Sequence, residues 1–470
     1  MELALNTGKT SESKGFYKLS MLQCVGFGSG DLAQNLIYQT ISMYLLFFYT
    51  NVYGLSPAVA AVMFLIVRII DVIWDPLVGT YVDKHDPKYG KYRSYLVLGG
   101  IPLTGFALLC FWNGFSGSLV YAYVTYVGLS MCYTLVNVPY GALNASLTRD
   151  TAEITKLTSV RMFMANVGGL AVGMGIPVVL RMFDPSEGSD LSLHDGAWFN
   201  TMALYGGIGL ILLLFCFSQC KERVVMDKKE TENVKVSDLW MEFVHNRPLR
   251  ILAFFFITAF AMMAIGNSAG AYYINYNMHG TAGELSIFMG LGSLPAFIFM
   301  PLIPPIKRMV GKKWMFYIFL VTAVVGMAML YAVSMIPELR QMRLVYIAQF
   351  VKSTGIIVAT GYMWALVPEV ISYGEYKHGR RISGIVNALT GIFYKAGMAL
   401  GGVVPGLVLA FVGFDNMSET QTLFAQQGIL WLVAVIPAIL LVAAMFIISR
   451  YELDDDRIDE INRIIEERNN

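Results

Sequence analysis

Long apolar segments recur along the whole sequence and constrain its fold more than any other feature. Hydrophobic residues make up 56% of the 470 residues and charged residues only 14%. A helix needs about 20 apolar residues to cross a bilayer. By this measure the chain has twelve candidate spans, at residues 26–53, 56–83, 94–114, 117–147, 158–184, 199–219, 249–278, 284–306, 313–335, 341–372, 382–413 and 423–449. The sequence therefore predicts an all-α integral membrane protein.

Lys and Arg are concentrated in the connections on one side of the predicted membrane. The connections after spans 2, 8 and 10 are rich in these residues, whereas those after spans 1, 3 and 11 contain none. Positively charged loops stay preferentially in the cytoplasm. The segment Met1–Lys18 is polar and shows no cleavable signal peptide. We therefore predict a multi-pass protein of the plasma (inner) membrane with both termini in the cytoplasm.

A long hydrophilic stretch divides the twelve spans into two groups of six. A short motif after span 2, Gly90–Arg93 (GKYR), resembles Gly311–Trp314 (GKKW) after span 8, which favours two related halves. We predict four parts: an N-terminal half (1–219), a cytoplasmic central loop (220–248), a C-terminal half (249–450) and a cytoplasmic tail (451–470).

The second span carries three ionisable residues on one helix face. Arg68, Asp71 and Asp75 are spaced i, i+3, i+7, so their side chains point the same way in a helix. One guanidinium for two carboxylates leaves this face with a net negative charge. Ionisable groups at membrane depth are costly and usually bind or relay an ion. A static salt bridge between helices is the structural alternative to a site for a cation or proton.

Other spans also contain polar side chains that could share a cavity with this face. They are Asp31 and Asn35 in span 1, Thr134 and Asn137 in span 4, Arg161 in span 5, Lys352 and Trp364 in span 10, and Asn387 and Lys395 in span 11. A lone amide can be explained by one interhelical hydrogen bond, worth about 0.6 kcal/mol. The charges are too numerous for that explanation. Charged and amide groups bind sugar hydroxyls, and aromatic rings stack on sugar faces, so the pattern suits a polyhydroxylated solute.

Motifs of zinc metalloproteases and of cysteine metal sites are absent from the sequence. It contains no HExxH motif, and its five cysteines form no CxxC pair. We therefore predict that the protein is not an enzyme and has no cofactor and no certain metal site.

Six motifs spread over nearly the whole chain carry a resemblance to a known family. They are GDLAQN (Gly30–Asn35), FFYTNVYGL (Phe47–Leu55), RIIDVIWDPLVG (Arg68–Gly79), YGKYR (Tyr89–Arg93), NVPYGAL (Asn137–Leu143) and SYGEYKHGRR (Ser372–Arg381). Together they resemble the glycoside–pentoside–hexuronide:cation symporters, relatives of melibiose permease in the major facilitator superfamily. Through Val120–Gly141 the chain resembles the glucuronide and pentoside permeases most. The resemblance implies twelve transmembrane helices in two six-helix halves and secondary active transport by alternating access.

The resemblance also implies roles for individual residues. It implies a coupling-cation site at Asp71 and Asp75, with Thr134 beside it and Lys395 linking it to the sugar site. It implies sugar contacts from Arg161 and from the helix 1 aspartate. With the polar residues of the spans added, the predicted substrate-binding set is Asp31, Asn35, Arg68, Asn137, Arg161, Trp364, Asn387 and Lys395.

Two departures from melibiose permease lie in span 4 and one in span 2. Asn137 takes the place of a sugar-binding aspartate and Gly141 that of a tryptophan, so melibiose is not the expected substrate. Trp74 precedes Asp75 where the sodium-using relative has asparagine. Fewer oxygen ligands and a bulky apolar neighbour desolvate the carboxylates, which favours capture of a proton. We predict H⁺ as the coupling cation, with Na⁺ at Asp71 and Asp75 as the alternative.

The predicted function is cation-coupled symport of a glycoside, pentoside or hexuronide. The alternatives are a sodium-coupled sugar symporter or a lysolipid symporter of the same fold and, from a different class, a membrane sensor that transports nothing. The expected partners are a small-molecule sugar and the lipid bilayer, with no nucleic acid and no appended regulatory domain.

Overall fold

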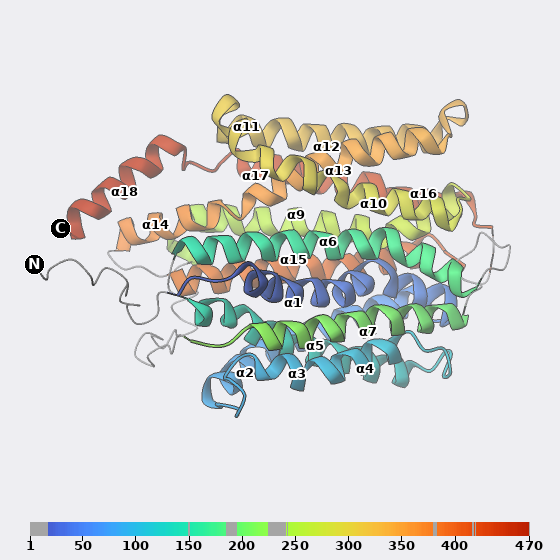
Figure 1. The fold of residues 1–470 in the computed structure, drawn as a ribbon. Coiled ribbons are helices and arrows are strands. Elements are labelled where there is room, and N and C mark those ends of the chain that lie inside the picture. The colour runs from blue at the N-terminus through green and yellow to red at the C-terminus, as the bar shows by residue number, and fades with distance from the viewer. Residues whose placement is uncertain are drawn as a thin grey trace, which may run out of the picture.

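The computed structural model describes residues 17–148, 151–184, 195–223, 241, 243–378, 383–415, 418 and 420–469. Within these residues the regular elements are all helical. The helices lie side by side in one elongated bundle, and α18 (Asp455–Asn469) projects from one end of it (Figure 1). We call this end the terminal end and the opposite one the distal end.

The helices up to residue 219 begin with an interrupted run. The run 21–52 contains α1 (Met21–Thr40) and two π-helical segments, η1 (Ile41–Leu45) and η2 (Phe48–Val52). It is followed by α2 (Pro57–Lys84), α3 (Ser94–Leu98), α4 (Gly100–Cys110), α5 (Leu119–Leu147), α6 (Thr151–Phe183) and α7 (Asp195–Gln219). Pro76 in α2 and Pro139 in α5 each lack an N–H group and so leave a carbonyl one turn earlier without its helical partner.

The second group of helices begins at residue 247. Its elements are α9 (Arg247–Tyr272), η4 (Tyr273–Asn277), α10 (Ala282–Phe299), η5 (Met300–Leu302), α11 (Ile303–Val310), α12 (Lys312–Met335), η6 (Pro337–Leu339), α13 (Met342–Met363), α14 (Leu366–His378), α15 (Ser383–Phe411), α16 (Leu423–Leu430), η7 (Trp431–Val435) and α17 (Ile436–Ile448). The tail helix α18 lies within the predicted tail, 451–470.

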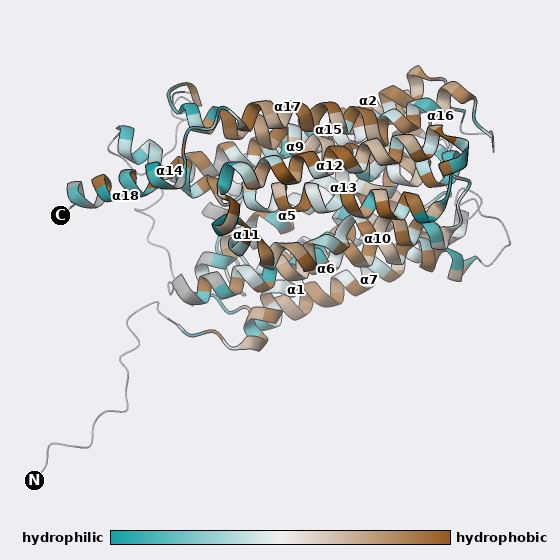
Figure 2. Ribbon diagram, turned by 90° about the horizontal axis from the view of Figure 1, so that it is seen from above, coloured by the Kyte–Doolittle hydropathy of each residue, from teal (hydrophilic) through white to brown (hydrophobic). Residues whose placement is uncertain are grey.

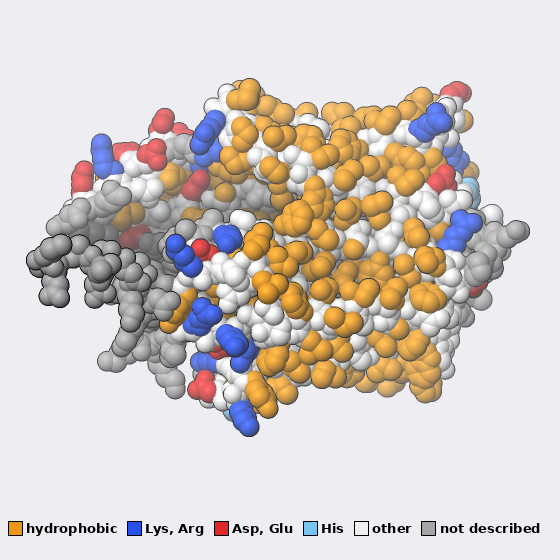
Figure 3. Space-filling view, in the orientation of Figure 1, with side chains coloured by type: hydrophobic (Ala, Val, Ile, Leu, Met, Phe, Trp, Pro, Cys, Tyr) orange, Lys and Arg blue, Asp and Glu red, His pale blue; other side chains and the backbone are white. Residues whose placement is uncertain are grey.

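The helices present a hydrophobic surface suited to lipid. Ten segments are long and apolar enough to cross a membrane by length and composition. The shorter apolar helical stretch Ser94–Cys110 and the run 21–52 bring the number of crossings in the described chain to twelve. On the face shown in Figure 3, hydrophobic side chains form a broad band across the middle, and charged side chains gather toward the two ends. In the ribbon coloured by hydropathy, hydrophobic residues likewise predominate along the middle of the helices (Figure 2). The predicted twelve-helix membrane fold is confirmed.

Helices pack mainly within each group. In the first group α1 packs on α6 and α7, while α2 and α4 pack on α5. In the second group α9 packs on α15 and α17, while α10 and α12 pack on α13. The main contacts between the groups are α6 with α10 and α2 with α15. The boundaries of the four predicted parts stay a prediction, because most of the central loop, including residues 224–240, lies outside the described residues.

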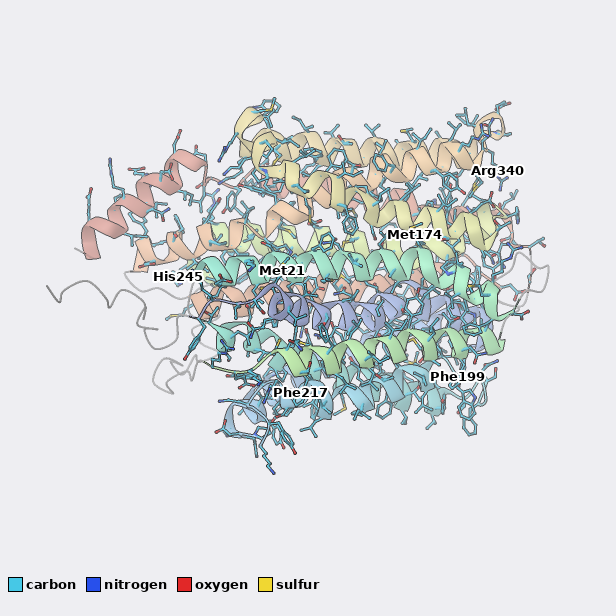
Figure 4. The ribbon with its side chains drawn as sticks, viewed as in Figure 1. Met21, Met174, Phe199, Phe217, His245 and Arg340 are labelled. Carbon is cyan, nitrogen blue, oxygen red and sulfur yellow. The ribbon has the colours of Figure 1, made fainter. Side chains whose placement is uncertain are left out.

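The two groups of helices are hydrogen-bonded to each other toward the distal end. The hydroxyl groups of Thr50 and Tyr272 lie 2.6 Å apart. On α10, Ser286 donates to the carbonyl oxygen of Met174 at 2.5 Å. Met174 is labelled on α6 in Figure 4. These bonds join helices that are far apart in the sequence, so they hold the distal end of the bundle together.

A glycine on α15 allows α2 to approach closely at the same end. A Cβ atom at Gly406 would lie 2.8 Å from the carbonyl oxygen of Pro57 and 2.7 Å from the Cβ of Ala61. No side chain fits in that space unless the helices separate, and small residues permit such close packing in membranes. The distal end is therefore closed by packing as well as by hydrogen bonds.

A buried ion pair holds the terminal end of the second group together. Lys312 Nζ lies 2.8 Å from both carboxylate oxygens of Glu369 and donates to the carbonyl oxygen of Leu453 at 3.0 Å. The hydroxyl of Tyr451 donates to Glu369 at 3.1 Å. Burial and the neighbouring carboxylate of Glu369 raise the pKa of Tyr451 well above its ordinary value, so this phenol keeps its proton. The cluster ties α12, α14 and the segment after α17 together.

Replacing Lys312 by Met is expected to destabilise the protein by about 3 kcal/mol, because Glu369 would remain as a buried carboxylate without its cation. Melting can be followed in detergent with a thiol-reactive dye, since Cys24 and Cys216 are buried in the folded protein and become reactive on unfolding. Lys313→Met is the matched control, because Lys313 is exposed on the same helix. Equal melting temperatures for the two variants would contradict a stabilising role for this ion pair.

Candidate functional site

Helix α2 turns apolar side chains outward and charged ones toward the bundle. Ile69, Val72 and Ile73 are 54%, 59% and 62% exposed, whereas Asp71 is only 7% exposed. This is the separation of faces expected from the i, i+3, i+7 spacing. The acidic face of α2 therefore contacts protein rather than lipid.

The first carboxylate of α2 is held from its own helix and from α5. Oδ2 of Asp71 accepts a hydrogen bond from Nη1 of Arg68 at 3.1 Å. Oδ1 accepts a short hydrogen bond from the hydroxyl of Ser130. Both carboxylate oxygens are therefore engaged. The local pair of Arg68 and Asp71 agrees with the prediction from the sequence.

The second carboxylate connects three helices. Oδ1 of Asp75 accepts a hydrogen bond from the hydroxyl of Thr134 on α5 at 2.9 Å. Oδ2 forms an ion pair with Nζ of Lys395 on α15. Since α2 and α5 belong to the first group of helices and α15 to the second, this carboxylate sits at the contact between the two groups.

We call these six residues the carboxylate cluster: Arg68, Asp71, Asp75, Ser130, Thr134 and Lys395. With two cationic and two anionic side chains, the cluster is formally neutral. The net negative charge expected from α2 alone is thus compensated by Lys395, a residue from another helix.

Ser130 was not singled out from the sequence, although a signal for it exists. The hydrogen bonds from Ser130 to Asp71 and from Thr134 to Asp75 both join residues 59 positions apart. Residues four apart on one helix thus meet residues four apart on the neighbouring helix. Once Thr134 is placed beside Asp75, a hydroxyl one turn earlier falls beside Asp71.

The bulky residue before Asp75 is also fixed by α5. Nε1 of Trp74 donates to the carbonyl oxygen of Met131 at 3.2 Å. The ring is half-buried against the small cluster formed by Val78, Val82 and their neighbours. Trp74 therefore bonds to the carbonyl oxygen of Met131, the residue that directly follows Ser130 of the carboxylate cluster.

A second charged pair joins α1 to α6. Nε of Arg161 lies 3.2 Å from Oδ2 of Asp31, and the guanidinium lies over the ring of Tyr140 at 5.2 Å from its centroid. The Asp31 and Arg161 side chains are 12% and 24% exposed. The structure thus brings together two residues that were predicted separately for sugar binding. Both retain some access to the space between helices.

The three predicted asparagines differ in their surroundings. Asn35 donates to the carbonyl oxygen of Asp31 at 2.9 Å and accepts from Gln39. Asn137 is half-buried on α5, three residues after Thr134. Asn387 lies on α15, but its side chain is outside the described part of the chain.

A cavity of about 410 Å³, which we call the central cavity, lies between the two groups of helices. Helices α1 and α6 line one side, and α9, α10 and α13 line the other. Among the predicted substrate residues, Trp364 lines this cavity, and it also packs on the rings of Phe260 and Tyr394. The polar side chains of its lining include Gln39, Asn166, Asn267, Ser293, Gln349 and Lys352.

Most of these polar lining residues were missed as site residues by sequence reasoning. Lys352 was noted as a charge within a span but was given no role. Gln349 lies one turn before it and would share its helix face. A lysine within a span, with a polar residue three positions before it, was thus the sequence signal that could have indicated a polar cavity lining. The helices that complete the cavity could not be inferred from that pattern.

No metal-binding cluster stands out in the described residues. Among them, no group of three or more His, Cys, Asp or Glu side chains is placed to hold a metal ion. Cys24, Cys110, Cys216 and Cys220 are buried, and Cys132 is partly buried.

The fold and the in-membrane charges together define a helical membrane transporter. The family model described as MFS/sugar transport protein matches residues 26–455. The chain belongs to this family of transporters and is not an enzyme.

Relatives cover almost the whole chain. It is 45% identical over 460 residues to the uncharacterized symporter YnaJ of Bacillus subtilis (strain 168), with 97% of both chains covered. It is 30% identical over 455 residues to the putative glycoside/cation symporter YagG of Escherichia coli (strain K12), with 95% of both covered. The crystal structure of the nucleoside transporter NupG has a similar fold, with a TM-score of 0.63 at 15% identity over 92% of this chain and 100% of that one. The family model and the match to the putative glycoside/cation symporter confirm the resemblance to the glycoside–pentoside–hexuronide:cation symporters, and the NupG match shows the fold alone.

Proposed function

We propose that this protein is a cation-coupled symporter for a sugar or glycoside in the plasma (inner) membrane, with both termini in the cytoplasm. The observation that carries the proposal is the ion pair between Asp75 and Lys395 beside the hydroxyl of Thr134. Asp75 lies at the contact between the two groups of helices, which supports a role for this carboxylate in binding the coupling cation. The glycoside/cation relative named above supports the same function.

Coupling follows from competition for one carboxylate. A cation that binds Asp75 displaces Lys395, because both need the same negatively charged oxygens. The released ammonium then no longer holds α15 against α2. A ligand shifts a conformational equilibrium only through its different affinities for the two states. Binding of the cation and the sugar together therefore allows the loaded protein to reorient.

The arrangement of the two ends corresponds to one state of the transport cycle. With cytoplasmic termini, the terminal end faces the cytoplasm and the distal end faces outward. The hydrogen bond between Thr50 and Tyr272 and the close packing at Gly406 then close the outer end. This state is therefore closed toward the outside.

The substrate site in this proposal combines charged pairs with aromatic rings. A carboxylate such as Asp31 accepts from a sugar hydroxyl while the adjacent guanidinium of Arg161 donates to another. The indole of Trp364 offers an apolar face to the ring of the sugar. The remaining residues that we assign to substrate binding are Asn35, Arg68, Asn137, Asn387 and Lys395.

A proton suits the carboxylate cluster better than sodium. Sodium needs several oxygen ligands around one point, whereas a proton needs a single carboxylate oxygen. Both carboxylates already have cationic partners, and Ser130 and Thr134 contribute one neutral oxygen each. The carbonyl oxygen of Met131 is occupied by Trp74. Asp71 and Asp75 remain the ligands for Na⁺ in the alternative.

Transport by the purified protein in liposomes tests this function. A counterflow screen of pentosides, glucuronides and galactosides identifies a substrate. Its uptake is then measured at fixed membrane potential, with and without sodium, under an imposed pH gradient. We expect an inwardly directed proton gradient to drive uptake without sodium. If sodium stimulates uptake and the pH gradient has no effect, the coupling cation is Na⁺ rather than a proton. Absence of saturable uptake of any sugar would overturn sugar symport and favour a lysolipid substrate or a sensor.

A further inference from the structure

The central cavity contains a buried lysine that has no anionic partner among the described residues. Lys352 on α13 is only 6% exposed and lines the cavity, whose described lining residues include no Asp or Glu. In the described part of the chain its ammonium forms neither a hydrogen bond nor an ion pair. Its ammonium lies 5.7 Å from the centroid of the Phe288 ring. A ring face at that distance compensates a buried charge less well than a carboxylate does.

The other deep charges of the transport region are already paired. Asp31 pairs with Arg161, Asp71 with Arg68, and Asp75 with Lys395. The three carboxylates predicted for the site therefore each have a cationic partner already. Lys352 is therefore a surplus positive charge in this region, rather than one half of an interhelical lock.

The surrounding helices hold Lys352 toward the cavity. On α12, a Cβ atom at Gly326 would lie 2.3 Å from the backbone nitrogen of Lys352, so α12 packs directly on the backbone of α13. The side chain extends along the cavity instead. One turn earlier, Gln349 is buried in the same lining, and its Oε1 has no hydrogen-bond partner among the described residues. Lys352 Nζ and Gln349 Oε1 thus share one helix face, and neither has a hydrogen-bond partner among the described residues.

A buried charge without a partner is costly, so a ligand that supplies the opposite charge gains affinity there. A neutral sugar offers only hydroxyl groups, whereas a carboxylate or sulfonate offers a full negative charge. The volume of about 410 Å³ lies within the range of ligand pockets, about 300–1,000 Å³. The cavity therefore has both the space and the charge for an acidic sugar.

We propose that Lys352 is the specificity residue of an anion subsite in the central cavity, where it binds the carboxylate or sulfonate of an acidic sugar. Gln349 binds a neighbouring hydroxyl in the same subsite. This inference rests on the proposed function, because it takes the central cavity as the place where the transported sugar binds.

Matched pairs of sugars test the subsite with the full-length protein. Methyl glycosides of glucose and galactose, in both anomers, are compared with the corresponding methyl uronides, which differ only in a carboxylate at C6. Binding is measured by thermal shift in detergent, and uptake by counterflow in liposomes. We expect at least one uronide to bind about 10-fold or more tightly than its neutral partner. The 6-sulfonate of that best-bound sugar then shows which of the two anions the subsite prefers.

Variants of Lys352 test whether this residue causes the preference for acidic over neutral sugars. Lys352→Met should reduce the preference to about twofold or less, and Lys352→Arg should preserve most of it because the charge remains. Lys313→Met, which removes an exposed lysine, should leave the preference unchanged. If Lys352→Met does not fold, Lys352→Gln and the comparison of matched sugars on the wild type still decide the question.

Each result bears on the inference. Transport of neutral glycosides with no preference for acidic ones, or a preference that survives Lys352→Met, would overturn the anion subsite while leaving sugar symport intact. Failure of every sugar to bind would overturn the proposed function and the subsite together. Loss of the anion preference, with uptake of the neutral partner retained, supports both.

Discussion

Asp75→Asn is expected to abolish uphill accumulation of sugar, with the ratio of internal to external substrate falling to about 1, because cation binding no longer biases the conformations. The amide keeps the size of the side chain and can still accept from Thr134, but it cannot pair with Lys395 or capture a cation. Counterflow exchange, which needs no net coupling, should persist. Accumulation is measured in energised vesicles and exchange in liposomes preloaded with sugar.

Asp86→Asn provides the matched control for this variant. Asp86 is exposed and follows α2, so loss of its charge should leave accumulation at the level of the wild type. If Asp75→Asn also accumulates substrate like the wild type, then Asp75 is not the coupling carboxylate. Loss of exchange as well as accumulation in a correctly folded variant would make Asp75 part of the substrate site instead.

Arg161→Gln is expected to weaken sugar binding by about 10–100-fold, which corresponds to the loss of one charge-assisted hydrogen bond of about 1.5–3 kcal/mol. The change removes the donors that lie beside Asp31 and leaves that carboxylate buried without its cation. Substrate affinity is measured from the concentration dependence of counterflow, and folding from the melting temperature. Arg343→Gln, at an exposed arginine, should change neither quantity.

A double variant separates binding from folding at this pair. Combining Asp31→Asn with Arg161→Gln removes both charges, so the melting temperature should return toward that of the wild type. If the pair binds sugar, affinity stays low in the double variant. Recovery of affinity together with the melting temperature would show that the pair serves only to stabilise the contact between α1 and α6.

Local spacing predicted the acidic face of α2 correctly. Residues three and four apart lie on one side of any helix, so Arg68 could be placed beside Asp71 without knowledge of the fold, and the structure has that ion pair at 3.1 Å. The resemblance placed Thr134 near the carboxylates, and its hydroxyl donates to Asp75. Whether these residues bind the coupling cation stays a prediction.

Contacts between helices that are far apart in the sequence could not be predicted from residue spacing. Lys395 was expected to link the cation and sugar sites, and the structure pairs it with Asp75. Nothing in the spacing within α15 specifies that partner, since it depends on how α15 crosses α2. That crossing in turn depends on glycines such as Gly406, which let the two backbones approach.

The sequence by itself determined the membrane-spanning helices, because a bilayer requires long apolar segments whose backbone groups bond within each segment. It also determined which in-span residues carry charge. Only the tertiary structure decided how those charges are compensated. Packing pairs Asp31 with Arg161 and Asp75 with Lys395, and it leaves Lys352 beside an open cavity. Charge compensation within a membrane depends on distances between helices, and these are set by side-chain packing over residues far apart in the chain.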